Sequence, residues 1–428
     1  MRIVFYVLVA GVSGVVTFGA SWAIWKLSHK YRLYPQIRAR DVHTRPTPRL
    51  GGIALFLGIV IAFAVGSQLP ALALIYAQPQ QVLAVLAAAL LIVLIGVADD
   101  IWDLDWFTKL AGQVMVAGLL AWQGVQIAWI PLPGTVAPLS PYMSLLVTVF
   151  LIVLVMNAVN FIDGLDGLVA GVAVIASAAF FVYGYIVSYG PTEQSNYFNL
   201  AQFITAALIG GCAGFLPWNW RRGDARPARL FMGDGGALLV GLLMATSTVA
   251  LAGRSVPAST SQGLVALLPV ILPLAVLIVP LADFTLAILR RMRAGKSPFS
   301  ADRNHLHHRL LDMGHSHVHA VIIFYAWTAV ASVGMLLFLI PGRGLLIGGM
   351  VMLVGFVVCT IVTLAPLSRR KAAEAAVQSA PAELAEDAGV AGFDPLDAAS
   401  EASEAGTEHT SAEAAEAIER LHEKEASS

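Results

Sequence analysis

Residues 157–171 read NAVNFIDGLDGLVAG, and this polar stretch lies between two apolar runs, residues 143–156 and 168–186. Apolar segments of about 17–25 residues are typical of membrane-spanning helices. Polar groups at membrane depth are costly unless they face a cavity or a partner, so they usually mark functional sites. Asp163 and Asp166 are three residues apart, so one helical turn would place both carboxylates on one face. A polar loop with a helix cap is the alternative interpretation.

The composition of the chain is typical of a membrane protein. Of its 428 residues, 58% are hydrophobic and 12% are charged, whereas about 25% of the residues of a soluble domain are charged. The two cysteines, Cys212 and Cys359, lie in apolar runs and predict neither a disulfide framework nor a zinc site. The first apolar run, residues 3–25, is longer than the core of a signal peptide and precedes a basic segment, so we expect a retained helix.

The apolar runs predict an all-α, polytopic integral membrane protein with about eleven transmembrane helices. Lysine and arginine are enriched in the cytoplasmic loops of such proteins. On one predicted side of the membrane they are abundant, whereas the other side holds only Arg2, Arg254 and Arg343. We therefore expect the N-terminus outside and the C-terminus in the cytoplasm. The runs lie near residues 3–25, 51–67, 82–98, 110–127, 143–159, 168–187, 201–216, 236–252, 264–281, 320–340 and 344–365.

The composition changes near the C-terminus and predicts two domains. From Lys371 onward the chain is rich in Ala, Glu and Ser and has almost no large apolar side chains. Such a composition cannot bury a hydrophobic core. We expect a multi-spanning membrane domain over residues 1–368 and a disordered cytoplasmic tail over residues 369–428.

Four further polar clusters lie on the predicted cytoplasmic side, and the first is DVHTRPTPRLGG, residues 41–52. Pro46 and Pro48 favour an extended backbone. The basic residues of the segment, Arg49 among them, could bind an anion. An ordinary basic loop beside the membrane is the alternative.

The second cluster is DDIWDLDWFTK, residues 99–109, which follows an apolar run. Asp99 and Asp103 would share a helical face, with Asp100 about 100° away. Adjacent carboxylates at a membrane boundary repel each other unless a cation or a proton lies between them. A solvated helix end is the alternative.

The third cluster is PARLFMGDGGALLVG, residues 227–241, in which Asp234 stands among glycines before an apolar run. Mg²⁺ typically binds one or two carboxylates and completes its shell with substrate phosphate and water. Asp234 is therefore a candidate Mg²⁺ ligand, and a helix N-cap is the alternative role.

The fourth cluster is SPFSADRNHLHHRLLDMGHS, residues 297–316. Its basic residues include Arg303, His305, His307 and His308, a set suited to binding anions or transferring protons. A zinc site is the competing chemistry, but no cysteine lies nearby. A structural role for the histidines is the other alternative.

These clusters combine carboxylates for Mg²⁺ with basic groups for phosphates in a membrane setting. That combination suits phosphoryl transfer, in which positioning and charge neutralisation supply most of the catalysis. No GxxxxGK[ST] loop is present, which argues against an ATP-driven pump.

The segments DVHTRPTPRLGG, DDIWDLDWFTK, NAVNFIDGLDG, PARLFMGD and NHLHH resemble, in this order, the motifs of the polyprenyl-phosphate N-acetylhexosamine-1-phosphate transferases. They extend over residues 40–315 and are most similar to the WecA/TagO branch of the MraY/WecA superfamily. The resemblance implies transfer of N-acetylglucosamine 1-phosphate from UDP-GlcNAc to a polyprenyl phosphate (undecaprenyl or decaprenyl), with release of UMP. This reaction would be the first membrane step of a cell-envelope glycan. The implied cofactor is Mg²⁺, with Mn²⁺ as a substitute.

The resemblance also implies roles for individual residues. One of the two adjacent aspartates would deprotonate or orient the lipid phosphate, the lysine would contact phosphate, and the histidines would lie near the diphosphate. Asp166 and Phe231 would contact the uridine, whereas the role of Asp163 is not fixed. The implied catalytic residues are Asp99, Asp100, Asp163, His307 and His308; the substrate-binding residues are Arg49, Lys109, Asp166, Phe231, Arg303 and His305; the metal ligands are Asp234 and Asn160.

Two alternatives remain at this point. An MraY-like enzyme would use a peptide-bearing UDP-sugar, phospho-MurNAc-pentapeptide being the transferred group. A transporter of a charged solute would also place polar residues in broken helices, but clustering on one side of the membrane argues against it. The expected setting is a bacterial inner (plasma) membrane with the active site on the cytoplasmic face. The expected partners are the UDP-sugar, the polyprenyl lipid and the bilayer; no nucleic acid is expected, and homodimer formation is left open.

Overall fold

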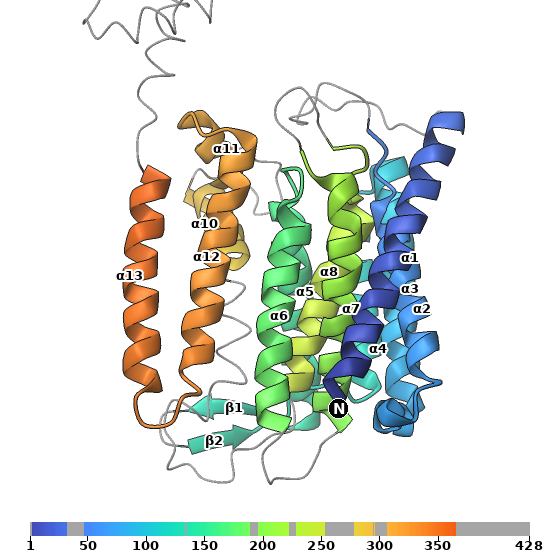
Figure 1. Cartoon of the computed structure of the whole chain (residues 1–428), viewed down its shortest axis with the longest axis vertical. Helices are drawn as coiled ribbons and strands as arrows, with labels where there is room; N and C mark the ends of the chain where they lie inside the picture. The colour runs from blue at the N-terminus through green and yellow to red at the C-terminus, as the bar shows by residue number, and fades with distance from the viewer. Residues whose placement is uncertain are drawn as a thin grey trace, which may run out of the picture. The chain divides into compact units, whose positions relative to one another are not determined.

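Helices form almost all of the regular structure in the described part of the chain (Figure 1). The computed structural model describes residues 2–31, 47–132, 135–188, 196–221, 228–252, 278–293, 295 and 306–364. The chain divides into two units, the first of residues 1–309 and 317–363 and the second of residues 310–316 and 364–428. The membrane helices belong to the first unit, and the predicted tail lies outside the described residues.

The described elements are helices, with one pair of short strands between α4 and α5. A 3₁₀ helix, η1, follows α2 directly, and the other helices are α-helical. The elements are α1 (Arg2–Tyr31), α2 (Gly51–Gly66), η1 (Pro70–Ala77), α3 (Pro79–Trp102), α4 (Trp106–Trp122), β1 (Trp129–Leu132), β2 (Thr135–Pro138), α5 (Pro141–Ile162), α6 (Leu168–Ser188), α7 (Asn196–Asn219), α8 (Gly233–Ala252), α10 (Ile278–Arg293), α11 (Leu306–Asp312), α12 (His317–Leu337) and α13 (Gly344–Leu364).

The length and apolar composition of these helices confirm a polytopic helical membrane protein. Among the described residues, 8 helices are long and apolar enough to cross a membrane, or up to 9 if the bent pair α2–η1 is one span. The expected run at residues 264–281 lies mostly outside the described part, and α4 has only 17 residues. The count of about eleven spans and the orientation of the termini therefore stay predictions.

One small sheet departs from the all-α expectation. Strands β1 and β2 pair antiparallel, with Trp129 opposite Pro138 and Ile130 opposite Ala137. Trp129 is buried and Ile130 is exposed, which is the alternation of a half-buried strand. Each strand has only 4 residues, too few to stand out between the long apolar runs on either side, so the sequence pattern did not reveal the sheet.

Helix α8 lies at the centre of the first unit. It contacts α2, α3, α5, α6 and α7, and every residue of the helix from Gly235 onward is buried. A helix that is apolar all round belongs inside a larger assembly of helices. Its neighbours therefore fix the position of its N-terminal end.

Close glycine contacts bring α2 and α3 against the first turn of α8. A Cβ atom added at Gly96 on α3 would lie 2.2 Å from the Cα atom of Gly235. A Cβ atom added at Gly52 on α2 would lie 2.4 Å from the backbone nitrogen of Gly236. Any side chain at these positions would force the helices apart, so glycine is what permits this approach.

Backbone hydrogen bonds tie the segment before α2 to the segment before α8. The Phe231 N–H donates to the Pro48 carbonyl oxygen at 2.9 Å, and the Gly51 N–H donates to the Phe231 carbonyl oxygen at 3.0 Å. The Gly52 N–H donates to the Met232 carbonyl oxygen at 2.9 Å. The two helix starts, and the residues carried on them, are thereby held side by side.

Candidate active site

Asp234 occupies the first turn of α8 and is held from both sides. Its backbone N–H donates to Asp100 Oδ2 at 3.0 Å. The preceding Gly233 has a φ of 69°, a left-handed conformation that favours glycine. A Cβ atom there would also lie 2.2 Å from the Arg49 carbonyl oxygen and 2.5 Å from Asp100 Oδ2. A carboxylate in the first turn of a helix is stabilised by the helix dipole.

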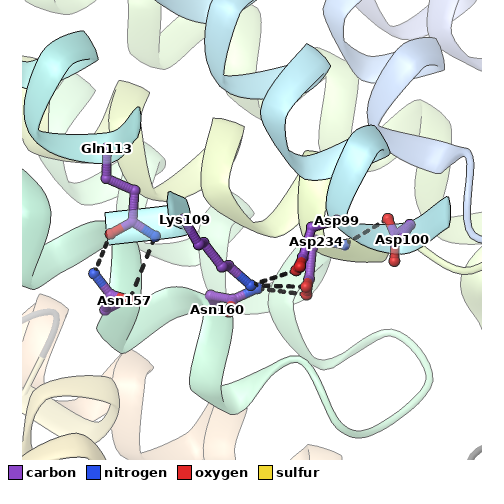
Figure 2. A network of polar contacts seen from close by, with 7 residues as sticks. All are labelled: Asp99, Asp100, Lys109, Gln113, Asn157, Asn160 and Asp234. Carbon is purple, nitrogen blue, oxygen red and sulfur yellow. Dashed lines mark hydrogen bonds and ion pairs between the residues drawn. The ribbon is translucent and has the colours of Figure 1, made fainter. Parts of the chain in front are cut away.

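Lys109 bridges two carboxylates that come from different helices (Figure 2). Its Nζ atom lies 2.8 Å from Asp99 Oδ2 and 2.8 Å from Asp234 Oδ2. The second oxygen of Asp234, Oδ1, accepts a hydrogen bond from Asn160 Nδ2 at 2.9 Å. The side chain of Asp234 is 31% exposed, whereas that of Asp99 is 7% exposed. A ligand can therefore reach Asp234 from solvent while Asp99 stays enclosed.

A tight reversal between α3 and α4 places Lys109 opposite Asp99. Asp103 directly follows the last residue of α3 and has a φ of 52°, a left-handed conformation that Asp adopts more readily than most residues. Asp105 then caps α4, and its carboxylate accepts from the Thr108 N–H and hydroxyl. The expectation that Asp99 and Asp103 share a helical face is wrong, because the helix ends at Trp102.

Asp163 lies directly after the last residue of α5 and close to the charges of the cluster. Burial, together with the negative charge of Asp234, raises the pKa of its carboxyl to about 7, although the Arg49 guanidinium opposes the shift. Asp163 can therefore exchange a proton near neutral pH. The catalytic role of Asp163 stays a prediction.

Asp166 is bound within the protein. Its Oδ2 atom accepts from Arg221 Nε at 3.0 Å and from the Ala228 N–H at 3.1 Å. Its side chain is 1% exposed. These contacts hold the turn after α5 against the segment before α8, and direct contact of this carboxylate with uridine stays a prediction.

The same turn is fixed by two further contacts. The Gly167 N–H donates to Asn219 Oδ1 at 2.9 Å, and Asn219 Nδ2 donates to the Leu230 carbonyl oxygen at 3.0 Å. The Tyr325 hydroxyl donates to the Gly167 carbonyl oxygen at 2.5 Å. Phe231, the next residue after Leu230, is half-buried. Its stacking on uridine stays a prediction.

The structure joins five of the thirteen predicted site residues in one polar network. Asp99 and Asp100 come from α3, Lys109 from α4, Asn160 from α5 and Asp234 from α8. The positions of Arg303 and His305 lie outside the described residues. Residues His307 and His308 belong to α11, but their side chains are not among those described.

Two members of the polar network were not assigned a role from the sequence. Gln113 on α4 and Asn157 on α5 form an amide pair that adjoins the cluster (Figure 2). Asn157 stood in the stretch that first indicated a site, but a lone Gln113 within an apolar run gave no signal by itself. Its spacing of four residues from Lys109 is the one clue that the sequence offered.

The donor set of the cluster suits a hard divalent cation. Oδ2 of Asp99 and Oδ2 of Asp234 both lie 2.8 Å from one ammonium nitrogen, so the two carboxylates converge on a single cationic centre. Within the described ranges no group of three or more His, Cys, Asp or Glu side chains forms a metal cage. Mg²⁺ commonly binds through one or two carboxylates and fills its shell with phosphate and water, so these residues fit it.

Comparison with known proteins gives consistent matches. Residues 82–252, from α3 to α8, match the family described as glycosyl transferase family 4. The chain is 41% identical over 372 residues to the decaprenyl-phosphate N-acetylglucosaminephosphotransferase of Mycolicibacterium smegmatis, covering 85% of this chain and 89% of the relative. It is 31% identical over 288 residues to the probable undecaprenyl-phosphate N-acetylglucosaminyl 1-phosphate transferase of Bacillus subtilis, covering 67% and 72%. A phospho-N-acetylmuramoyl-pentapeptide-transferase of Desulforudis audaxviator is 29% identical over 256 residues, covering 54% and 72%.

Proposed function

Because the chain belongs to glycosyl transferase family 4, we propose that it transfers N-acetylglucosamine 1-phosphate from UDP-GlcNAc to a polyprenyl phosphate and releases UMP. The resemblance inferred from the motifs is thereby confirmed at the level of the family. The main structural support for this reaction is the contact of Lys109 with Asp99 and Asp234, which is formed by three helices at one end of the membrane unit. The lipid is undecaprenyl or decaprenyl phosphate, and the support is the names of the Mycolicibacterium smegmatis and Bacillus subtilis relatives.

In this reaction an oxygen of the lipid phosphate attacks the β-phosphorus of UDP-GlcNAc. A phosphorus–oxygen bond forms to the lipid, the bond from the β-phosphorus to the bridging oxygen breaks, and the electron pair leaves with UMP. Such a transfer depends mainly on positioning and on neutralising phosphate charge. Lys109 provides a positive charge that is fixed in place by Asp99 and Asp234, and Arg49 provides a second cation beside Asp100.

Asp234 would hold Mg²⁺, with Asp99 as the second carboxylate, and Mn²⁺ would substitute. When bound, the ion supplies charge neutralisation on the diphosphate. Asn160 faces Asp234 Oδ1 with its amide nitrogen, so here it orients the carboxylate. Direct ligation of the metal by Asn160 is a part of the proposal that rests on the resemblance alone.

The reaction takes place at the cytoplasmic face of a bacterial inner (plasma) membrane, with the N-terminus outside and the C-terminus in the cytoplasm. The support is the one-sided distribution of lysine and arginine, which in membrane proteins marks the cytoplasmic side. A soluble nucleotide-sugar would enter from the cytoplasm, and a lipid acceptor would enter from the bilayer.

The test is UMP release by the purified protein in detergent with polyprenyl phosphate and a panel of UDP-sugars. UDP-GlcNAc should support turnover, and UDP-MurNAc-pentapeptide should not. The reverse preference would favour the phospho-N-acetylmuramoyl-pentapeptide reaction of the Desulforudis audaxviator relative. Asp234→Asn should abolish UMP release while the protein stays folded, because the variant loses the charge that Lys109 contacts. Solute uptake into proteoliposomes without UMP release would instead identify a transporter.

A further inference from the structure

An amide pair joins α4 to α5 beside the Lys109 contact (Figure 2). Asn157 Nδ2 donates to Gln113 Oε1 at 2.5 Å and to the Val153 carbonyl oxygen at 2.8 Å. Gln113 Nε2 donates to Asn157 Oδ1 at 3.4 Å. Gln113 is 1% exposed. Asn157 is half-buried, so the pair joins one fully enclosed amide to one at the edge of the packed interior.

The positions of the pair relate it directly to the active site. Gln113 follows Lys109 by four residues on α4, and Asn157 precedes Asn160 by three residues on α5. Residues at these spacings lie on one helix face, one turn apart. Lys109 and Asn160 in turn contact the two oxygens of Asp234 on α8. On both α4 and α5, the member of the amide pair therefore lies one helical turn from the residue that contacts Asp234.

An amide pair with a fully buried member, Gln113, favours one register between two helices. An unpaired amide away from water costs free energy, whereas a paired amide does not. A shift of α4 along α5 would separate the buried Gln113 amide from the half-buried Asn157 amide, and each would lose the other as a partner. Single buried polar residues are known to fix register between apolar helices in this way.

We propose that Gln113 and Asn157 are a positioning pair, which fixes α4 against α5 so that the Lys109 ammonium and the Asn160 amide meet Asp234. The pair does not touch the reacting atoms; it acts through the two residues that contact Asp234. Lys109 needs such support because its side chain is long and flexible. The catalytic consequence rests on the proposed function, whereas the placement of Lys109 does not.

The test uses near-isosteric variants that remove one amide or both. Gln113→Met and Asn157→Leu each leave one amide without its partner, and the double variant removes the pair. The exchanged variant, Gln113→Asn with Asn157→Gln, keeps two amides across the same helix pair. The matched control is Gln126→Met. Gln126 also links the two helices, through the Ala121 carbonyl oxygen and the Ser144 hydroxyl, but at the opposite end of α4.

The first readout is the rate at which a soluble acetylating reagent modifies Lys109, measured by peptide mass spectrometry on the folded, detergent-solubilised full chain. Lys109 is enclosed by two carboxylates in the parent, so acetylation should be slow. We expect faster modification in both single variants, parental rates in Gln126→Met, and restored protection in the exchanged variant. Parental protection of Lys109 in both single variants would overturn the proposal, and so would equal deprotection in Gln126→Met.

The second readout is the kinetics of UMP release from UDP-GlcNAc. Misplacement of a catalytic group by about 1 Å can cost about 100-fold in rate, so we expect kcat to fall by about 10-fold to 100-fold in each single variant. KM for UDP-GlcNAc should change little, and the double variant should be no slower than the slower single variant. Independent losses that multiply in the double variant would contradict a pair. An inactive parent would contradict the proposed function, while the acetylation result would still decide the placement of Lys109.

Discussion

Gly96→Ala should disable the site from a position that contacts no substrate. Gly96 lies on α3, one turn before Asp99, and faces the backbone of α8. The added Cβ atom would lie 2.2 Å from Gly235 Cα, 2.3 Å from Gly235 N and 2.7 Å from the Asp234 carbonyl carbon. These are backbone atoms, so no side chain can rotate away to relieve the contact.

The size of the effect follows from the distances. Ordinary contacts of a Cβ atom begin at 3.4 Å, so α3 and α8 must separate by about 1 Å, an overpacking that typically costs about 1–3 kcal/mol of stability. The 3.0 Å bond from the Asp234 N–H to Asp100 Oδ2 and the shared contact of Lys109 cannot both survive that displacement. A misplacement of about 1 Å can cost about 100-fold in rate, so kcat should fall by about that factor.

The assay is UMP release at saturating UDP-GlcNAc, with a thermal melt in the same detergent. The matched control is Gly118→Ala, because Gly118 is an interior helical glycine on α4 and an added Cβ atom would meet nothing within 4 Å. The control should keep parental kcat and gain a little stability, since alanine is the better helix former. Parental kcat in Gly96→Ala would refute the inference that the α3–α8 approach positions the carboxylates.

Three further predictions concern the adjacent aspartates, Asp163 and the C-terminal tail. Asp99→Asn loses the ion pair with Lys109, whereas Asp100→Asn keeps a side-chain oxygen that can accept from the Asp234 N–H. The two variants should therefore differ in how their turnover depends on pH. Equal loss of UDP-GlcNAc binding in both variants would contradict a division of roles between the two aspartates. Burial raises the pKa of Asp163 from 3.8 to about 7, so the folded protein keeps a proton that the unfolded chain has lost. Asp163 should therefore contribute a fall in thermal stability as the pH rises from about 4 to about 7, and Asp163→Asn should make that fall shallower; an identical slope in the variant would be inconsistent with this contribution. Truncation after Lys371 should preserve specific activity in membranes, because the tail lacks apolar residues; lost turnover at normal expression would assign the tail a role.

The sequence predicted the membrane class and the main members of the site because both depend on local contrast. A carboxylate or an amide at the end of a long apolar run stands out, and Asp99, Asp100, Asn160 and Asp234 all do so. Their convergence could be expected because each ends or begins a span on the same predicted side.

The features that the sequence did not reveal depend on contacts between distant residues. Asp166 pairs with Arg221, 55 residues away, and Gln113 pairs with Asn157, 44 residues away. No local periodicity encodes which of several polar groups will meet after folding. The reversal after Trp102 was missed for a related reason, since the left-handed conformation of Asp103 depends on how α3 and α4 pack.

The fate of the β-phosphorus of the nucleotide-sugar distinguishes transfer of a sugar 1-phosphate from transfer of the sugar alone. The purified protein is incubated with polyprenyl phosphate, Mg²⁺ and UDP-GlcNAc that carries radioactive phosphorus in the β-phosphate, and the lipid fraction is extracted. Transfer of a sugar 1-phosphate predicts that the label enters the lipid while unlabelled UMP accumulates, and that Asp234→Asn gives no labelled lipid. Label that stays in soluble UDP would show transfer of the sugar alone. That result would contradict phosphoryl transfer at the Asp99–Lys109–Asp234 site.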